Sequence, residues 1–105
     1  MNSERIKILE QFIADDPADA FNHYALALEL LKVNRQEAEK KLDFLLQNFP
    51  DYLPAYYQAA LLKADLSFED QALKIIEQGI KVAMTQCNNK TVNELRSLMN
   101  TNLDE

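Results

Sequence analysis

The chain has 105 residues, of which 48% are hydrophobic and 27% are charged, as in a soluble globular domain. With one glycine and three prolines it has neither a glycine-rich phosphate loop nor the turns that sheets require, which disfavours nucleotide-binding and all-β folds. The net charge of −6 opposes binding to nucleic acid, and no apolar run approaches the roughly 20 residues that cross a membrane.

Apolar residues recur at spacings of three and four along most of the chain, which indicates amphipathic α-helices. Asp16 is predicted as the N-cap of the second helix, with Pro17 in its first turn, where a missing N–H costs nothing. Asn34 and Glu37 have the spacing of a capping box at the start of the third helix. The start and stop signals predict six short helices, at about residues 3–15, 17–33, 35–48, 54–66, 68–85 and 90–100.

The last two predicted helices also begin at capping signals. Ser67 precedes the fifth helix and Thr91 opens the sixth, each with an acidic residue three positions later. Gly79 lies inside the fifth helix, where a glycine costs roughly 1 kcal/mol relative to alanine. We therefore expect Gly79 to mark a close crossing of two helices.

The chain contains an internal repeat that covers two helices. A separation of 33 residues relates Pro17 to Pro50, Tyr24 to Tyr57 and Leu28 to Leu61, and one of 34 relates Ala38 to Ala72 and Leu42 to Ile76. The extra residue falls in the turn between the paired helices, where a change of length disturbs packing least.

A two-helix period of 33 to 34 residues resembles the tetratricopeptide repeat (TPR). Ala27, Ala38, Ala60 and Ala72 stand where that family has small residues, while Lys63 departs from its pattern. The resemblance implies an all-α, right-handed superhelix of about six short helices in three stacked antiparallel pairs. The end of the chain is similar to small bacterial proteins made of two such repeats and a closing helix.

This resemblance divides a single TPR-like domain of residues 1–105 into four parts. Residues 1–16 form an N-terminal half-repeat helix, 17–50 the first repeat, 51–84 the second repeat, and 85–105 a C-terminal capping helix and tail. Each repeat has an apolar face that it cannot bury alone, so the outer helices must act as caps.

The sequence gives little support to catalysis. His23 is the only histidine and stands where the TPR family packs a large side chain, so we interpret it as structural. Cys87 is the only cysteine, which excludes an internal disulfide and favours a reducing compartment, and the carboxylates are not joined to metal ligands. We expect a cytoplasmic protein that is not an enzyme and has no catalytic residues, metal or cofactor.

Binding is better supported, because the second helix is apolar on more sides than its own pair covers. In the TPR family, the apolar side of this helix that does not pack within its own helix pair lines a concave groove that holds peptides. The residues predicted to form this groove are Phe21, Tyr24, Leu28 and Leu31 on the second helix and Tyr57, Gln58 and Leu61 on the fourth. The repeat predicts that the two sets lie side by side.

The resemblance therefore implies a scaffold or adaptor that binds a segment of another protein. The positions that form a carboxylate clamp in chaperone-binding TPR domains are Tyr24, Leu28 and Gln58 here, and none of them is a cation. Such a groove favours apolar or aromatic partner side chains. The alternative is a structural protein that forms a homodimer through its apolar face and has no separate peptide ligand.

Overall fold

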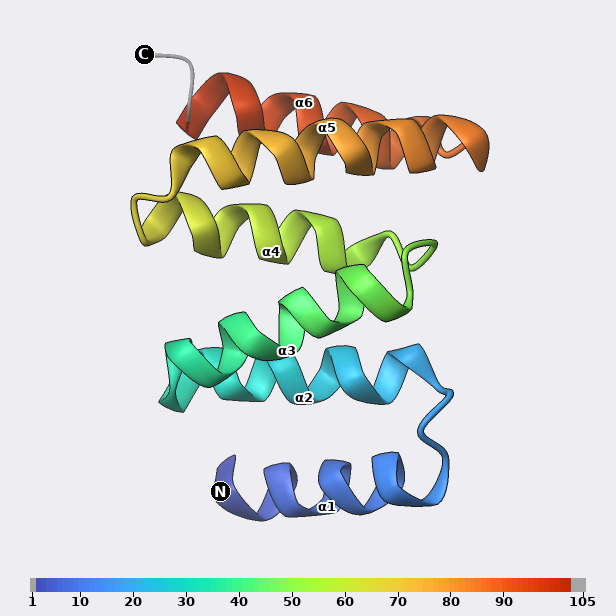
Figure 1. Cartoon of the computed structure of the whole chain (residues 1–105), viewed down its shortest axis with the longest axis vertical. Helices are drawn as coiled ribbons and strands as arrows, with labels where there is room; N and C mark the ends of the chain where they lie inside the picture. Colours follow the sequence, from blue (N-terminus) through green and yellow to red (C-terminus); the bar gives the residue numbers. More distant parts are fainter. Residues whose placement is uncertain (1, 103–105) are drawn as a thin grey trace. The chain divides into compact units, whose positions relative to one another are not determined.

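The computed structural model describes the backbone of residues 2–102 and the side chains of residues 3–100. Every regular element within this range is an α-helix, and no strand occurs there, which confirms the all-α prediction. The helices are α1 (Asn2–Asp15), α2 (Ala20–Val33), α3 (Arg35–Asn48), α4 (Pro54–Asp65), α5 (Glu69–Thr85) and α6 (Asn89–Asn102) (Figure 1). They form two compact units, α1 to α3 and α4 to α6, with the boundary between Phe49 and Pro50.

In the first unit, α2 packs against both α1 and α3, and neighbouring helices run antiparallel (Figure 1). A single residue, Asn34, joins α2 to α3. Its backbone N–H donates to the Leu30 carbonyl at 2.7 Å, and its side chain accepts from the Glu37 N–H at 3.2 Å. Asn34 thus ends one helix and caps the next, as the capping-box spacing predicts.

The predicted start of α2 is wrong by three residues. Asp19, and not Asp16, is the N-cap, since its carboxylate accepts from the Phe21 N–H at 3.0 Å. Pro17 lies outside the helix, and its carbonyl accepts a hydrogen bond from the His23 side chain. Residues 16–19 form a turn, in which the Asp16 carbonyl accepts from the Asp19 N–H at 3.3 Å and the Asp16 side chain accepts from the Ala18 N–H at 3.3 Å, and the helix begins after it.

In the second unit, α4 packs against both α5 and α6, and α5 packs against α6. Gly79 of α5 lies at the meeting point of the three helices. A Cβ atom at this position would stand 2.9 Å from Tyr56 Cβ of α4 and 2.9 Å from Leu95 Cδ1 of α6, which is closer than non-bonded carbon atoms pack. The predicted close helix crossing at Gly79 is confirmed.

Both turns of the second unit contain a residue with a left-handed backbone. Ser67 has φ 67° and Cys87 has φ 58°. In each turn the next residue, Phe68 or Asn88, donates its N–H to a carbonyl five positions earlier, in the pattern of the Schellman motif. Ser67 therefore ends α4, and the prediction that it caps α5 is wrong.

The start of α6 differs from its prediction in the same way. Asn88 caps this helix, since its side-chain oxygen accepts from the Thr91 N–H at 3.0 Å. Thr91 itself lies within the first helical turn, so the prediction that it is the cap is wrong. Apart from the start of α2, the predicted helix boundaries agree with the structure to within two residues.

Candidate interaction surfaces

The predicted groove residues of the first unit all lie on α2. Phe21 is exposed, and Tyr24, Leu28 and Leu31 are half-buried. Their spacing of three and four places them along one side of the helix. His23, Leu26 and Ala27 point into the unit instead and are buried. The predicted groove residues of α2 thus lie on a different side of the helix from its buried residues.

The predicted groove residues of the second unit, Tyr57, Gln58 and Leu61, are half-buried on α4. The neighbouring Tyr56 is buried, and its hydroxyl donates to the Pro50 carbonyl at 2.7 Å. Burial, with a smaller contribution from the charge of Asp51, raises the pKa of the Tyr56 phenol. That the sets on α2 and α4 form one surface stays a prediction.

Sequence reasoning missed an apolar hollow between α1 and α2. It measures about 410 Å³, and its lining consists of the apolar residues Ile8, Leu9, Phe12, Phe21 and Ala25 and the polar residues Glu4, Arg5 and Asn22. Three of these side chains face outward, with exposed fractions of 53% for Ile8, 49% for Phe12 and 60% for Phe21. The signal was present in the sequence, because Ile8 and Phe12 are four residues apart and so share one side of α1.

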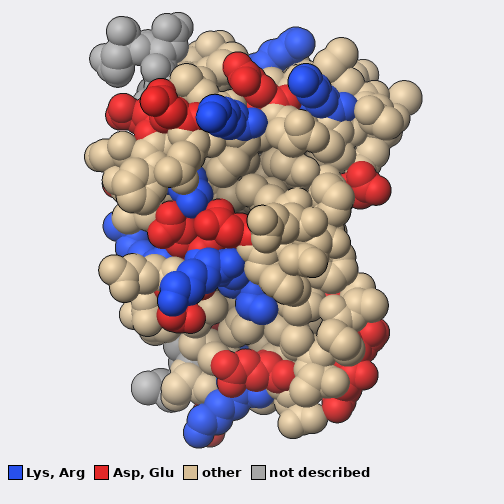
Figure 2. Space-filling model, in the orientation of Figure 1, with Lys and Arg blue, Asp and Glu red and all other residues tan. Residues whose placement is uncertain are grey.

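Acidic side chains gather at the loop that joins α1 to α2 (Figure 2). Asp15, Asp16 and Asp19 are all exposed there. Between Lys7 and Lys32 the sequence contains no lysine or arginine. The loop beside the hollow thus carries three exposed carboxylates, while Lys41 of α3 contacts His23 on the same unit.

A second hollow of about 380 Å³ lies within the first unit. Leu26, Leu30 and Phe44 line it, together with the half-buried Lys41. Burial lowers the pKa of the Lys41 ammonium, and the nearby charge of Glu10 opposes this effect. The ammonium lies 4.8 Å from the centre of the Phe44 ring and 3.3 Å from His23 Nδ1.

His23 is buried, with both ring nitrogens in polar contacts. Its Nε2–H donates to the Pro17 carbonyl at 2.8 Å, which leaves the Nδ1 lone pair to accept from the Lys41 ammonium. The ring packs 5.0 Å from Phe44 and 5.3 Å from Phe49, measured between centroids. These contacts fit the structural interpretation of His23.

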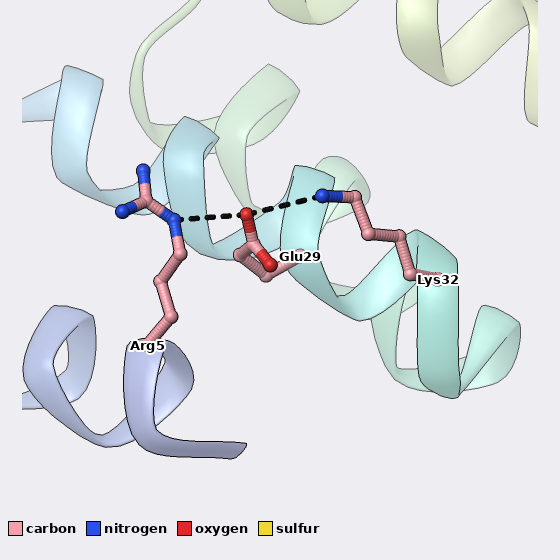
Figure 3. A network of polar contacts seen from close by, with 3 residues as sticks. All are labelled: Arg5, Glu29 and Lys32. Atoms are coloured by element: carbon pink, nitrogen blue, oxygen red, sulfur yellow. Dashed lines mark hydrogen bonds and ion pairs between the residues drawn. The ribbon is translucent and has the colours of Figure 1, made fainter. Parts of the chain in front are cut away.

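A buried carboxylate joins α1 to α2 (Figure 3). Glu29 Oε2 accepts from Arg5 Nε at 2.9 Å and from Lys32 Nζ at 3.4 Å. Glu29 Oε1 is buried and accepts no hydrogen bond from the described residues. Because a buried carboxylate is costly without its partners, the pair with Arg5 helps to hold α1 in place.

The described residues contain no group of three or more histidine, cysteine or acidic side chains placed to hold a metal ion. Within the same part of the chain, no helix has the length and apolar character needed to span a bilayer. The packing of successive antiparallel helices, with partly exposed apolar faces, places the described chain in the class of helical-repeat proteins.

No protein-family model matches the chain, and no curated protein does. Two solved structures do match. A solution NMR structure of a tetratricopeptide repeat domain protein from Salinibacter ruber is 34% identical, covers 85% of this chain and 91% of its own, and superposes with a TM-score of 0.79. A crystal structure of a tetratricopeptide repeat domain protein from the same organism is 36% identical, covers 75% of this chain and 89% of its own, and has a TM-score of 0.71. The chain belongs to the tetratricopeptide repeat family.

Proposed function

We propose that this TPR protein is a non-enzymatic interaction module that binds a segment of another protein through the predicted groove residues of α2 and α4. TPR domains generally mediate protein–protein interactions. The observation that carries the proposal is the outer stripe of α2, where Phe21, Tyr24, Leu28 and Leu31 remain exposed or half-buried after the helix has packed on α1 and α3. Such apolar and aromatic positions supply most of the energy at protein interfaces.

The chemistry of these positions selects the kind of partner. Tyrosine and leucine side chains favour apolar or aromatic anchors, while the tyrosine hydroxyls provide direction. Neither set contains a lysine or arginine that could pair with a terminal carboxylate. The acidic exterior, with its net charge of −6, mainly controls the rate of encounter and its salt dependence.

Peptide selection on the immobilised full chain, followed by affinity measurement, tests this proposal. Leu61→Glu and Leu28→Glu each place a charge on the stripe and should weaken the selected peptides at least tenfold while helicity and melting temperature stay nearly unchanged. Met84→Glu changes an exposed side chain of α5 and is the matched control, with no expected loss. Unfolding of the Leu61→Glu variant would place that residue in the core, and full retention of binding would assign the partner to another face.

The alternative is a structural protein that self-associates through the same apolar stripe. It is favoured by the same observation, because a second copy can cover exposed apolar surface as well as a peptide does. Light scattering distinguishes the two functions. A stable dimer that Leu61→Glu converts to a monomer supports self-association, whereas a wild-type monomer supports the proposed module.

A further inference from the structure

In the second unit a third helix covers the face formed by two successive helices, α5 and α6. There α4 packs on both α5 and α6 and runs antiparallel to α5 (Figure 1). Position 79 lies at the contact of all three helices. In the first unit, α1 and α2 are the equivalent pair of helices, because α1 precedes α2 as α5 precedes α6. Among the described helices of that unit, no counterpart of α4 packs on both α1 and α2.

The repeat spacing identifies the matching residues. Phe12, Leu45 and Gly79 are separated by 33 and 34 residues and so occupy one repeat position. Leu45 is fully buried and Gly79 is buried, but Phe12 is 49% exposed. The exposed position faces the hollow between α1 and α2. The hollow thus stands where the second unit has its covering helix.

We propose that this hollow is a docking site for an amphipathic helix of another protein, which lies along α1 as α4 lies along α5 and carries lysine or arginine in its first turns. Ile8 and Phe12 stand one turn apart on α1, with Phe21 across from them on α2. Apolar side chains at positions i, i+4 and i+7 of the partner match this row. The site is separate from the predicted groove, with which it shares only Phe21.

Charge determines both the direction and the composition of the partner helix. A helix antiparallel to α1 has its N-terminus near the end of α1, where Asp15, Asp16 and Asp19 lie in or beside the loop to α2. The partial positive charge of a helix N-terminus and basic side chains in its first turns both complement these carboxylates. A second copy of this chain is a poorer occupant, since each copy carries a net charge of −6.

The test uses two labelled peptides and the full chain. Both peptides have the same leucine stripe on an alanine-rich helix of about 16 residues, and one has lysines and the other glutamates in its first turn. Fluorescence anisotropy should show the lysine peptide binding at least tenfold more tightly than the glutamate peptide. Equal binding of the two peptides, or binding of neither, would overturn the proposal.

Substitutions assign the binding to the hollow. Phe12→Glu should weaken the lysine peptide at least tenfold, whereas Met84→Glu, at a residue of similar exposure on α5, should have no effect. The triple variant with Asp15, Asp16 and Asp19 changed to Asn keeps the oxygen acceptors of the loop and should weaken binding several-fold, with a smaller salt dependence. Leu61→Glu should leave this binding unchanged, so that failure of the groove proposal is seen separately.

Two further measurements establish the direction of the bound helix and whether the hollow holds another protein or a second copy of this chain. A nitroxide at the N-terminus of the lysine peptide should broaden the amide signals of residues 15–19, and broadening near Glu4 and Arg5 instead would contradict the proposed direction. Sedimentation of the free protein should show a monomer. A dimer that Phe12→Glu dissociates would give the hollow to a second copy and overturn the proposal.

Discussion

The two units are built from the same repeat, but they differ in how far a third helix covers the pair α1–α2 and the pair α5–α6. In the second unit three helices meet at Gly79, and α6 turns a polar side with Asn93, Arg96 and Asn100 to the outside. In the first unit Phe12 occupies the repeat position of Gly79 and is half exposed, with Ile8 and Phe21 beside it. At this repeat position the second unit has a glycine where three helices meet, Leu45 of α3 is buried, and Phe12 of α1 is a large aromatic residue that stays half exposed.

The largest expected effect comes from Gly79→Leu. The new side chain would collide with Tyr56 and Leu95, so the free energy of unfolding should fall by about 1–3 kcal/mol. Thermal unfolding followed by circular dichroism measures this loss, at about 4–8 °C per kcal/mol for a domain of this size. The control is Phe12→Leu at the matching position of α1, for which we expect less than about 0.5 kcal/mol. Equal effects at both positions would contradict the difference between the units.

The next effect concerns the link between α1 and α2. Arg5→Ala removes the shorter of the two contacts to the buried Glu29 carboxylate and should cost about 1 kcal/mol, a value reduced by the exposure of the arginine side chain. Urea denaturation measures it. Lys40→Ala breaks the exposed pair with Glu37 and should cost at most about 0.5 kcal/mol. Adding Glu29→Met to Arg5→Ala should recover stability, because it removes a buried carboxylate that would retain only the longer contact with Lys32.

Lys41 gives the first unit an alkaline pH dependence. Burial in the folded protein lowers the Lys41 pKa, so the unfolded chain binds more protons than the folded chain as the pH approaches the ordinary lysine pKa of 10.5. This group therefore makes stability rise with pH in the window below 10.5. Tyr56 acts in the opposite sense, since its pKa is raised by folding and its contribution falls as the pH passes 10.0.

The variant Lys41→Met isolates the lysine contribution from that of Tyr56. The difference in unfolding free energy between this variant and the wild type should shift toward the wild type as the pH rises from about 8 to 10.5. Urea titrations at several pH values measure it. A difference that is constant over this range would show that Lys41 is not desolvated in the folded protein.

The smallest effect concerns the turns. Glycine adopts a positive φ without the steric cost of a side chain. Cys87→Gly and Ser67→Gly should therefore each raise the free energy of unfolding by about 0 to 1 kcal/mol. Asn34→Gly in the first unit should instead cost a few tenths of a kcal/mol, because Asn34 has an extended backbone and caps α3 with its side chain. Destabilisation by Cys87→Gly would contradict the Schellman turn.

Much of the fold was predictable from the sequence, because the repeat spacing and the caps act locally. Asn34 and Pro54 begin their helices as predicted. The errors lie where one local signal wins over another, as where Asp19 caps α2 in place of Asp16 and Asn88 caps α6 in place of Thr91. Pro17 fits the first turn of a helix by its chemistry, but its carbonyl accepts from His23, and the helix starts later. Lys63 departs from the TPR pattern yet is buried, with its ammonium 6.0 Å from the Phe68 ring.

The candidate sites were predictable only in part. The stripe of α2 follows from helical spacing, and the structure shows it partly exposed. The hollow beside Ile8 and Phe12 was missed because the sequence of α1 does not tell whether another helix covers that side. An apolar residue looks the same in the sequence whether its neighbour is a helix or the solvent.

An amide chemical-shift titration of the full chain with the lysine peptide shows whether the apolar face of α1 and α2 accepts a partner helix while α4 covers the equivalent face of α5 and α6. We expect shifts at residues 8–12 and 21–25, none in α6, and at least tenfold weaker binding by the Phe12→Glu variant. Shifts concentrated on α5 and α6, or binding of equal strength by Phe12→Glu, would contradict the proposed site.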